Sequence, residues 1–228
     1  MLRMAAESGT TDIVATPHAD LHYKFQPELM EERIAELERE IGESPRIHRG
    51  CDFHLAFDNI QEALAKPHKY TIDHRRYLLV EFSEMVIFPN ATDLFDRMLG
   101  AGMIPIVTHP ERNSLLRHRL PLLEEWIAMG CLLQITSGAL LGDFGKKAEA
   151  FSDALLKQGL AHAVASDAHD TKYRTTDLRP ARARVAERYG EDLAERLFLE
   201  NPQAIIAGEL LPAPLAPPPK KKWIRFWS

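Results

Sequence analysis

Side chains that commonly bind metal ions follow three short apolar runs of this 228-residue chain. They occur in the segments Thr16-Pro17-His18, Thr108-His109-Pro110-Glu111-Arg112 and Ser166-Asp167-Ala168-His169. Because alternate residues of an extended segment point the same way, we expect Asp167 and His169 to reach a common metal cluster. A nitrogen and oxygen ligand set without thiolate favours Mn²⁺, Fe or Zn²⁺. Clusters of such ions promote phosphoester hydrolysis, in which a metal-bound hydroxide attacks phosphorus.

Two carboxylates extend this candidate set. Glu81 directly follows the apolar residues 78–80, and an ionised carboxylate so close to a buried strand needs a cation as its partner. The alternative for Glu81 is a structural salt bridge to an arginine. Asp52 is a weaker candidate metal ligand, because His54 and Asp58 crowd the same stretch and a role in a turn is its alternative.

Arg112 is the predicted phosphate-binding residue. It follows His109 by three residues, and its planar guanidinium group matches phosphate oxygens and would stabilise the charge that grows on them during the reaction. The alternative is an ion pair between Arg112 and its neighbour Glu111. The remaining histidines have no comparable sequence context, and we interpret them as structural or solvent-facing: His22, His48, His54, His68, His74, His118 and His162.

The elements that must position these side chains alternate along the chain. Four glycines are predicted helix C-caps, and each precedes an apolar run that is typical of a buried parallel strand. These glycines are Gly9, Gly102, Gly130 and Gly159, and the strands are predicted at 13–15, 104–107, 132–135 and 163–165. Two more strands are predicted at 47–55 and 77–82, with helices at 27–41, 58–65, 91–101, 121–129, 144–158, 178–189 and 191–199. The alternation predicts an α/β fold, a βα barrel whose strands gather their C-terminal ends at one mouth.

Composition limits the functional classes. An apolar content of 45% over 228 residues is enough for one substantial core, which we place at residues 1–210 as a single domain. The net charge of −5 argues against a nucleic-acid partner. Cys51 and Cys131 are too few for a disulfide framework, and the chain shows neither a membrane-spanning run nor a secretory signal. We therefore expect a reducing, cytoplasmic location.

The last residues differ from the rest in composition. Residues 211–228 form a predicted proline-rich linker that leads into Lys220–Lys222 and the aromatic segment 223–227. Basic aromatic segments rest reversibly at anionic membrane surfaces, so residues 220–227 are predicted to make peripheral contact with the inner face of the membrane. The alternatives are a disordered, solubilising end and a segment that docks a partner.

Five segments of the chain carry a family resemblance. They occur in the order that is seen in PHP-type (polymerase and histidinol phosphatase) metal-dependent protein-tyrosine phosphatases of bacterial capsule and exopolysaccharide loci. The segments are Thr16–His18, Gly50–Phe53, Leu79–Ser83, Thr108–Arg112 and Ala165–His169, and the resemblance covers roughly residues 1–210.

This resemblance implies a distorted TIM-like βα barrel with a trinuclear, often manganese-loaded site. It implies hydrolysis of phosphotyrosine on a bacterial tyrosine kinase that regulates polysaccharide export. By the same resemblance Arg112 binds phosphate, although such enzymes often carry glutamate where this chain has Asp52. The implied metal ligands are His18, Asp52, Glu81, His109, Asp167 and His169.

The chain departs from the family pattern at its beginning. Family members open with a strand that bears an Asp-x-His-x-His motif, whereas this sequence starts at Met1-Leu2-Arg3-Met4, inside the expected first outer helix. About 30 residues, the opening half of one βα unit, would be missing. Either the protein in the cell begins further upstream, which we favour, or the chain has lost part of its metal cluster. For the 228-residue chain we expect weaker metal binding and little activity.

Other functions remain open at this stage. A histidinol-phosphate phosphatase would use the same ligands on a small substrate. A metal-poor module that recognises the kinase without hydrolysing it belongs to a different class. A nuclease is disfavoured by the acidic charge balance and by the lack of a basic stripe.

Overall fold

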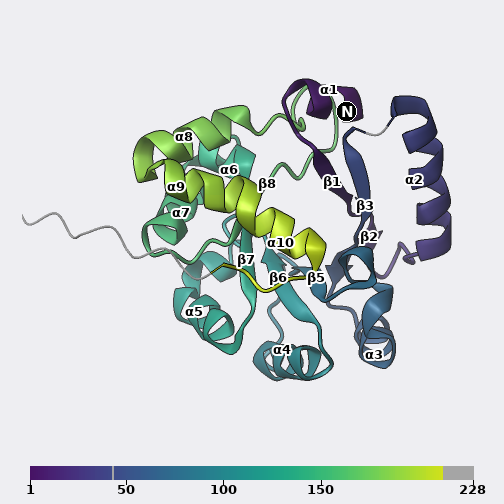
Figure 1. Cartoon of the computed structure of the whole chain (residues 1–228). Coiled ribbons are helices and arrows are strands. Elements are labelled where there is room, and N and C mark those ends of the chain that lie inside the picture. The colour runs from purple at the N-terminus through teal and green to yellow at the C-terminus, as the bar shows by residue number, and fades with distance from the viewer. Residues whose placement is uncertain (43, 213–228) are drawn as a thin grey trace, which may run out of the picture.

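Parallel strands form the centre of the protein (Figure 1). The computed structural model describes residues 1–42 and 44–212, so the predicted membrane-contacting tail at 220–227 lies outside the described residues. Within that range the strands form a six-stranded sheet in the order β2-β4-β5-β6-β7-β8 and a two-stranded sheet, β1-β3. The strands are β1 (Asp12–Ala15), β2 (His18–Ala19), β3 (Arg46–Arg49), β4 (Asp52–His54), β5 (Tyr77–Glu81), β6 (Ile104–Thr108), β7 (Leu132–Thr136) and β8 (Ala163–Ala165).

The predicted α/β fold is confirmed, but the closed barrel is not. In the described part of the chain β2 and β8 are the two edge strands of the larger sheet, and no pairing joins them. The predicted strand 47–55 is also divided, into β3 and β4. The division falls at Gly50, where a Cβ atom would lie only 2.5 Å from Cγ1 of Val14. The backbones approach too closely there for any larger residue.

Helices follow the strands as the sequence predicts. The predicted helix 27–41 is observed residue for residue, whereas the predicted helix 191–199 is divided between α9 and a π turn, η4 (Arg196–Glu200). None of the helices in the described residues is long and apolar enough to cross a bilayer. The α-helices are α1 (Leu2–Glu7), α2 (Pro27–Ile41), α3 (Phe57–Ala65), α4 (Ala91–Gly100), α5 (Leu120–Met129), α6 (Ser137–Leu141), α7 (Gly145–Lys157), α8 (Arg179–Tyr189), α9 (Glu191–Glu195) and α10 (Asn201–Ala207). Short turns of 3₁₀ helix are η1 (Pro67–Lys69), η2 (Ile72–His74) and η3 (Leu116–His118).

The two faces of the sheet pack into different apolar clusters. In β5, Leu78 and Val80 join the large cluster with the outer helices, whereas Tyr77 and Leu79 join a smaller cluster that includes Ile205 of α10. This division follows from the alternation of side chains along a strand. By the same alternation Glu81, the last residue of β5, projects from the face that carries the smaller cluster. The candidate site is therefore expected at the C-terminal edge of that face.

Candidate metal centre

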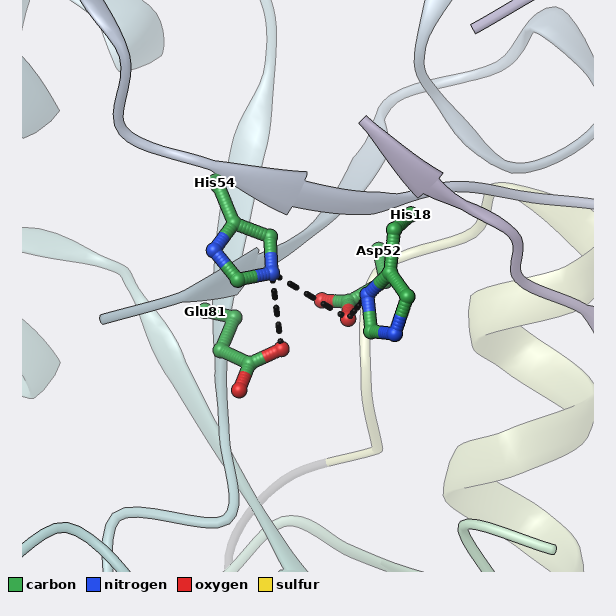
Figure 2. Close-up of side chains that lie close together, drawn as sticks. All are labelled: His18, Asp52, His54 and Glu81. Carbon is green, nitrogen blue, oxygen red and sulfur yellow. Dashed lines mark ion pairs between the residues drawn. The ribbon is translucent and has the colours of Figure 1, made fainter. Parts of the chain in front are cut away.

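Three neighbouring strands bring four metal-binding side chains together. His18 comes from β2, Asp52 and His54 come from β4, and Glu81 ends β5 (Figure 2). The strand register pairs His18 with Asp52 and His54 with Glu81, so the side chains leave the sheet in the same direction. One ligand atom from each residue lies within 4.8 Å of the others. We call these four residues the strand-end cluster.

The contacts within the strand-end cluster leave two polar atoms without hydrogen bonds. His18 Nδ1 lies 2.6 Å from Asp52 Oδ2, and His54 Nε2 lies 3.0 Å from Glu81 Oε2 and 3.6 Å from Asp52 Oδ2. Asp52 Oδ1 and His54 Nε2 are nevertheless buried and accept or donate no hydrogen bond in the described residues. Buried polar atoms without partners are rare in folded proteins. Two imidazoles and two carboxylates with such atoms fit a divalent cation.

The carboxylates control the protonation of the cluster. The carboxylate of Asp52, and to a smaller extent that of Glu81, raises the pKa of His54 to about 10. Burial alone would raise the pKa of Asp52, but its close contacts with His54 and His18 lower it below 3.8. Without a metal, a proton on His54 therefore supplies the positive charge between two carboxylates. A bound cation would take the place of that proton.

His109 lies next to the strand-end cluster, on the loop that follows β6. Its Nε2 atom is 3.7 Å from Glu81 Oε1. Burial lowers the pKa of His109 below 6.5, so its imidazole is neutral near pH 7, the form that binds metals. Its backbone has a φ of 34°, a left-handed conformation that costs a non-glycine residue energy and recurs at functional sites.

Glu111 anchors the same loop instead of pairing with Arg112. Its side chain is fully buried and accepts a 2.7 Å hydrogen bond from the backbone N–H of Thr136. Burial raises the pKa of Glu111 to about 7. The Glu111 alternative for Arg112 is therefore wrong, because Arg112 forms its ion pair with Asp167. Thr136 ends β7, the strand after Gly130, which is followed by no predicted metal ligand. Its backbone N–H instead holds the loop of His109 through Glu111.

Asp167 and His169 form a second group, separate from the strand-end cluster. The extended backbone that the sequence predicted for them is wrong, because β8 ends at Ala165 and Asp167 has a φ of 48°. His169 Nδ1 lies 3.8 Å from the side-chain oxygen Oδ1 of Asp167 and 2.9 Å from the backbone carbonyl oxygen of the same residue. Asp167 Oδ2 accepts hydrogen bonds from both Arg112 and Arg174. The metal-ligand role of this pair stays a prediction.

Two residues of this region were missed by sequence reasoning. The sequence context of His54 predicts a structural or solvent-facing role, yet His54 lies inside the strand-end cluster. A signal was present, because Asp52 and His54 alternate on one predicted strand and so share a face. Arg174 gave no comparable signal, since only the fold of its loop brings it to Asp167.

Known proteins resemble this chain over nearly its whole length. Residues 1–207 match the family described as "Capsular polysaccharide synthesis, CpsB/CapC". The chain is 32% identical to the tyrosine-protein phosphatase YwqE of Bacillus subtilis, over all of this chain and 91% of that protein. It is 33% identical to the putative tyrosine-protein phosphatase CapC of Staphylococcus aureus, over 98% of this chain and 89% of that protein.

A solved structure agrees with these sequence relatives. It comes from a study of YwqE from Bacillus subtilis and CpsB from Streptococcus pneumoniae, described there as unique metal-dependent tyrosine phosphatases. It superposes on this chain with a TM-score of 0.85 at 31% identity, and the match covers 95% of this chain and 90% of the other.

Proposed function

Because this chain belongs to the CpsB/CapC family of capsular polysaccharide synthesis proteins, we propose that it is a metal-dependent phosphatase that hydrolyses phosphotyrosine on a protein. The observation that carries this proposal is the strand-end cluster, with its buried Asp52 Oδ1 and His54 Nε2 atoms that lack hydrogen bonds. His18, Asp52, His54 and Glu81 would hold the metal, with His109 beside them. The nitrogen and oxygen donors suit Mn²⁺, Fe and Zn²⁺, and Mn²⁺ is our first choice because the family resemblance implies a site that is often loaded with manganese.

Bound divalent ions would bind phosphate oxygens and lower the pKa of water. The protein itself contributes the grip on the phosphate. Arg112 and Arg174 converge on one anionic oxygen, Oδ2 of Asp167. A phosphate monoester presents oxygens of the same charge, and guanidinium groups bind such oxygens through parallel N–H donors. The two arginines would therefore orient the phosphate and stabilise the charge that develops on it.

We assign this activity to residues 1–210, which include the family match over residues 1–207. Apolar clusters cover both faces of the sheet, and α10 packs on the face that carries the site, which supports an α/β architecture with helices around a parallel sheet. The substrate protein that we propose is a bacterial tyrosine kinase, because the family takes its description from capsular polysaccharide synthesis. A cytoplasmic location is supported by Cys51 and Cys131, which are both buried and unpaired.

The test measures phosphate release by the purified protein after addition of Mn²⁺. A phosphotyrosyl peptide and histidinol phosphate are offered in parallel, and bound metal is measured by mass spectrometry. We expect low but metal-dependent turnover of the peptide. Preference for histidinol phosphate would favour the small-molecule phosphatase. A protein that binds no metal and hydrolyses neither substrate would favour the metal-poor binding module.

A further inference from the structure

The ring of Phe144 lies beneath both arginines of the candidate phosphate site. Phe144 falls between α6 and α7, and its ring centroid is 4.3 Å from Cζ of Arg112 and 5.9 Å from Cζ of Arg174. An arginine within about 6 Å of an aromatic centroid is attracted to the ring face. Phe144 is only half-buried and does not belong to either apolar cluster of the described residues. Core packing therefore does not explain its place.

The backbone of α6 fixes the position of this ring. A Cβ atom on Gly138 would lie 3.0 Å from Cε2 of Phe144 and 3.0 Å from Oδ2 of Asp143, so the ring sits directly against the helix where glycine leaves room. A ring that is held by backbone on one side can restrain a mobile side chain on the other. Arginine has many rotamers, and holding it in one of them before the ligand arrives lowers the entropy that binding must overcome.

We propose that Phe144 is a positioning residue that holds the guanidinium group of Arg112, and more weakly that of Arg174, ready to bind the phosphate of the substrate. Stacking on the ring face leaves the N–H edge of a guanidinium free to donate to oxygen. The inference rests on the proposed phosphatase function. Its ligand chemistry is a phosphate group, whether on phosphotyrosine or as inorganic phosphate.

The first experiment replaces the ring. We expect Phe144→Leu to weaken binding of inorganic phosphate by about threefold to thirtyfold, as measured by calorimetry on the Mn²⁺-loaded protein, with a parallel rise in KM for a phosphotyrosyl peptide. Phe144→Trp should keep wild-type binding, because it keeps an aromatic face. The matched control is Phe151→Leu, a half-buried aromatic of α7 that packs against the core. Equal phosphate binding by Phe144→Leu and Phe151→Leu would overturn the proposal.

The second experiment asks whether Phe144 acts through Arg112. In an Arg112→Ala background, Phe144→Leu should lose most of its effect on phosphate binding, because interacting residues give non-additive effects. An undiminished effect, with metal content and melting temperature unchanged, would contradict the positioning role. These results are separable from the proposed function, since phosphate binding is measured without turnover. A wild-type protein that binds phosphate but hydrolyses no phosphotyrosine would contradict the proposed function and leave the positioning role of Phe144 standing.

Discussion

Two histidine–carboxylate clusters lie in different sheets of the molecule, one on β2, β4 and β5 of the six-stranded sheet and one at the β1-β3 pair, and they differ in how their polar atoms are hydrogen-bonded. The second cluster consists of Asp12, His48 of β3 and Asp73 of η2, and we call it the strand-start cluster because Asp12 begins β1. His48 Nδ1 lies 2.7 Å from Asp73 Oδ2, and His48 Nε2 lies 2.9 Å from Asp12 Oδ1. Each ring nitrogen of His48 thus has a carboxylate of its own.

The strand-end cluster uses the same residue types in a different way. There His54 Nε2 faces the carboxylates of both Asp52 and Glu81 and forms a hydrogen bond with neither. Satisfied polar groups stabilise a fold, whereas unsatisfied buried groups require an explanation, such as an ion. The comparison teaches that the hydrogen-bond state of the atoms, and not the residue types, separates a structural cluster from a candidate metal site.

The largest expected effect comes from Asp52→Asn in the strand-end cluster. The amide keeps the shape of the side chain but removes the charge that faces both His18 and His54. We expect metal content and kcat/KM to fall by at least about 100-fold, beyond the range typical of groups that only support a ligand. The matched control is Asp73→Asn in the strand-start cluster. This variant should keep the wild-type metal content, because the metal binds at the strand-end cluster. Equal metal loss in both variants would break the distinction between the clusters.

Adding metal should stabilise the protein through one cluster only. At a free Mn²⁺ concentration 100 times its Kd, the free energy of unfolding should rise by about 2.7 kcal/mol. Asp73→Asn should show the same rise and Asp52→Asn none, as followed by urea unfolding with and without Mn²⁺. A rise that survives in Asp52→Asn would place the metal elsewhere.

Removing the charge of Asp73 should lower stability without touching the metal. Asp73 accepts a 2.9 Å hydrogen bond from the backbone N–H of Arg49 as well as pairing with His48. We expect Asp73→Asn to lower the free energy of unfolding by about 1–2 kcal/mol. Asparagine tolerates the left-handed backbone at this position, where φ is 47°, so the loss reports the charge. An unchanged urea midpoint would show that the cluster is not stabilising.

The smallest effect is a pH dependence that belongs to His48. Hydrogen bonding to Asp73 raises the pKa of His48 above 6.5, against the opposing effect of burial. The folded state therefore binds this proton more tightly than the unfolded state does. The resulting stability is fully present below about pH 6.5 and is lost as pH rises through the folded-state pKa.

The stability difference between the wild type and His48→Gln should consequently shrink as the pH rises above 6.5 and through the folded-state pKa of His48. Urea unfolding with a chelator present measures this difference while the strand-end cluster is free of metal. His68→Gln, at an exposed histidine, is the control and should differ little from the wild type over the same pH range. A difference for His48→Gln that stays constant with pH would contradict the prediction.

Much of the fold could be predicted because its signals are local. Apolar runs after Gly9, Gly102, Gly130 and Gly159 marked the strands, and all four glycines have positive φ angles. The closure of the sheet could not be predicted in this way. Alternating strands and helices report which segments are buried, and this pattern is the same in an open and in a closed sheet.

The candidate site was predictable only in part. His18, Asp52 and Glu81 lie together as the shared edge of parallel strands implies. Asp167 does not follow the extended pattern, because its left-handed φ turns it toward Arg112 and Arg174. Such a turn depends on contacts that residues distant in the sequence make.

The sequence by itself determined where most of the strands lie, the residue types that follow them and the family to which the chain belongs. These properties follow from residue order and from the two-residue period of a strand. Only the tertiary structure decided which histidines belong to the metal site. His48 and His54 are six residues apart, on strands of two different sheets. Asp73 reaches His48 through η2, whereas Glu81 reaches His54 through β5. The function of each imidazole depends on the carboxylates that face it, and these come from elements that only folding brings together.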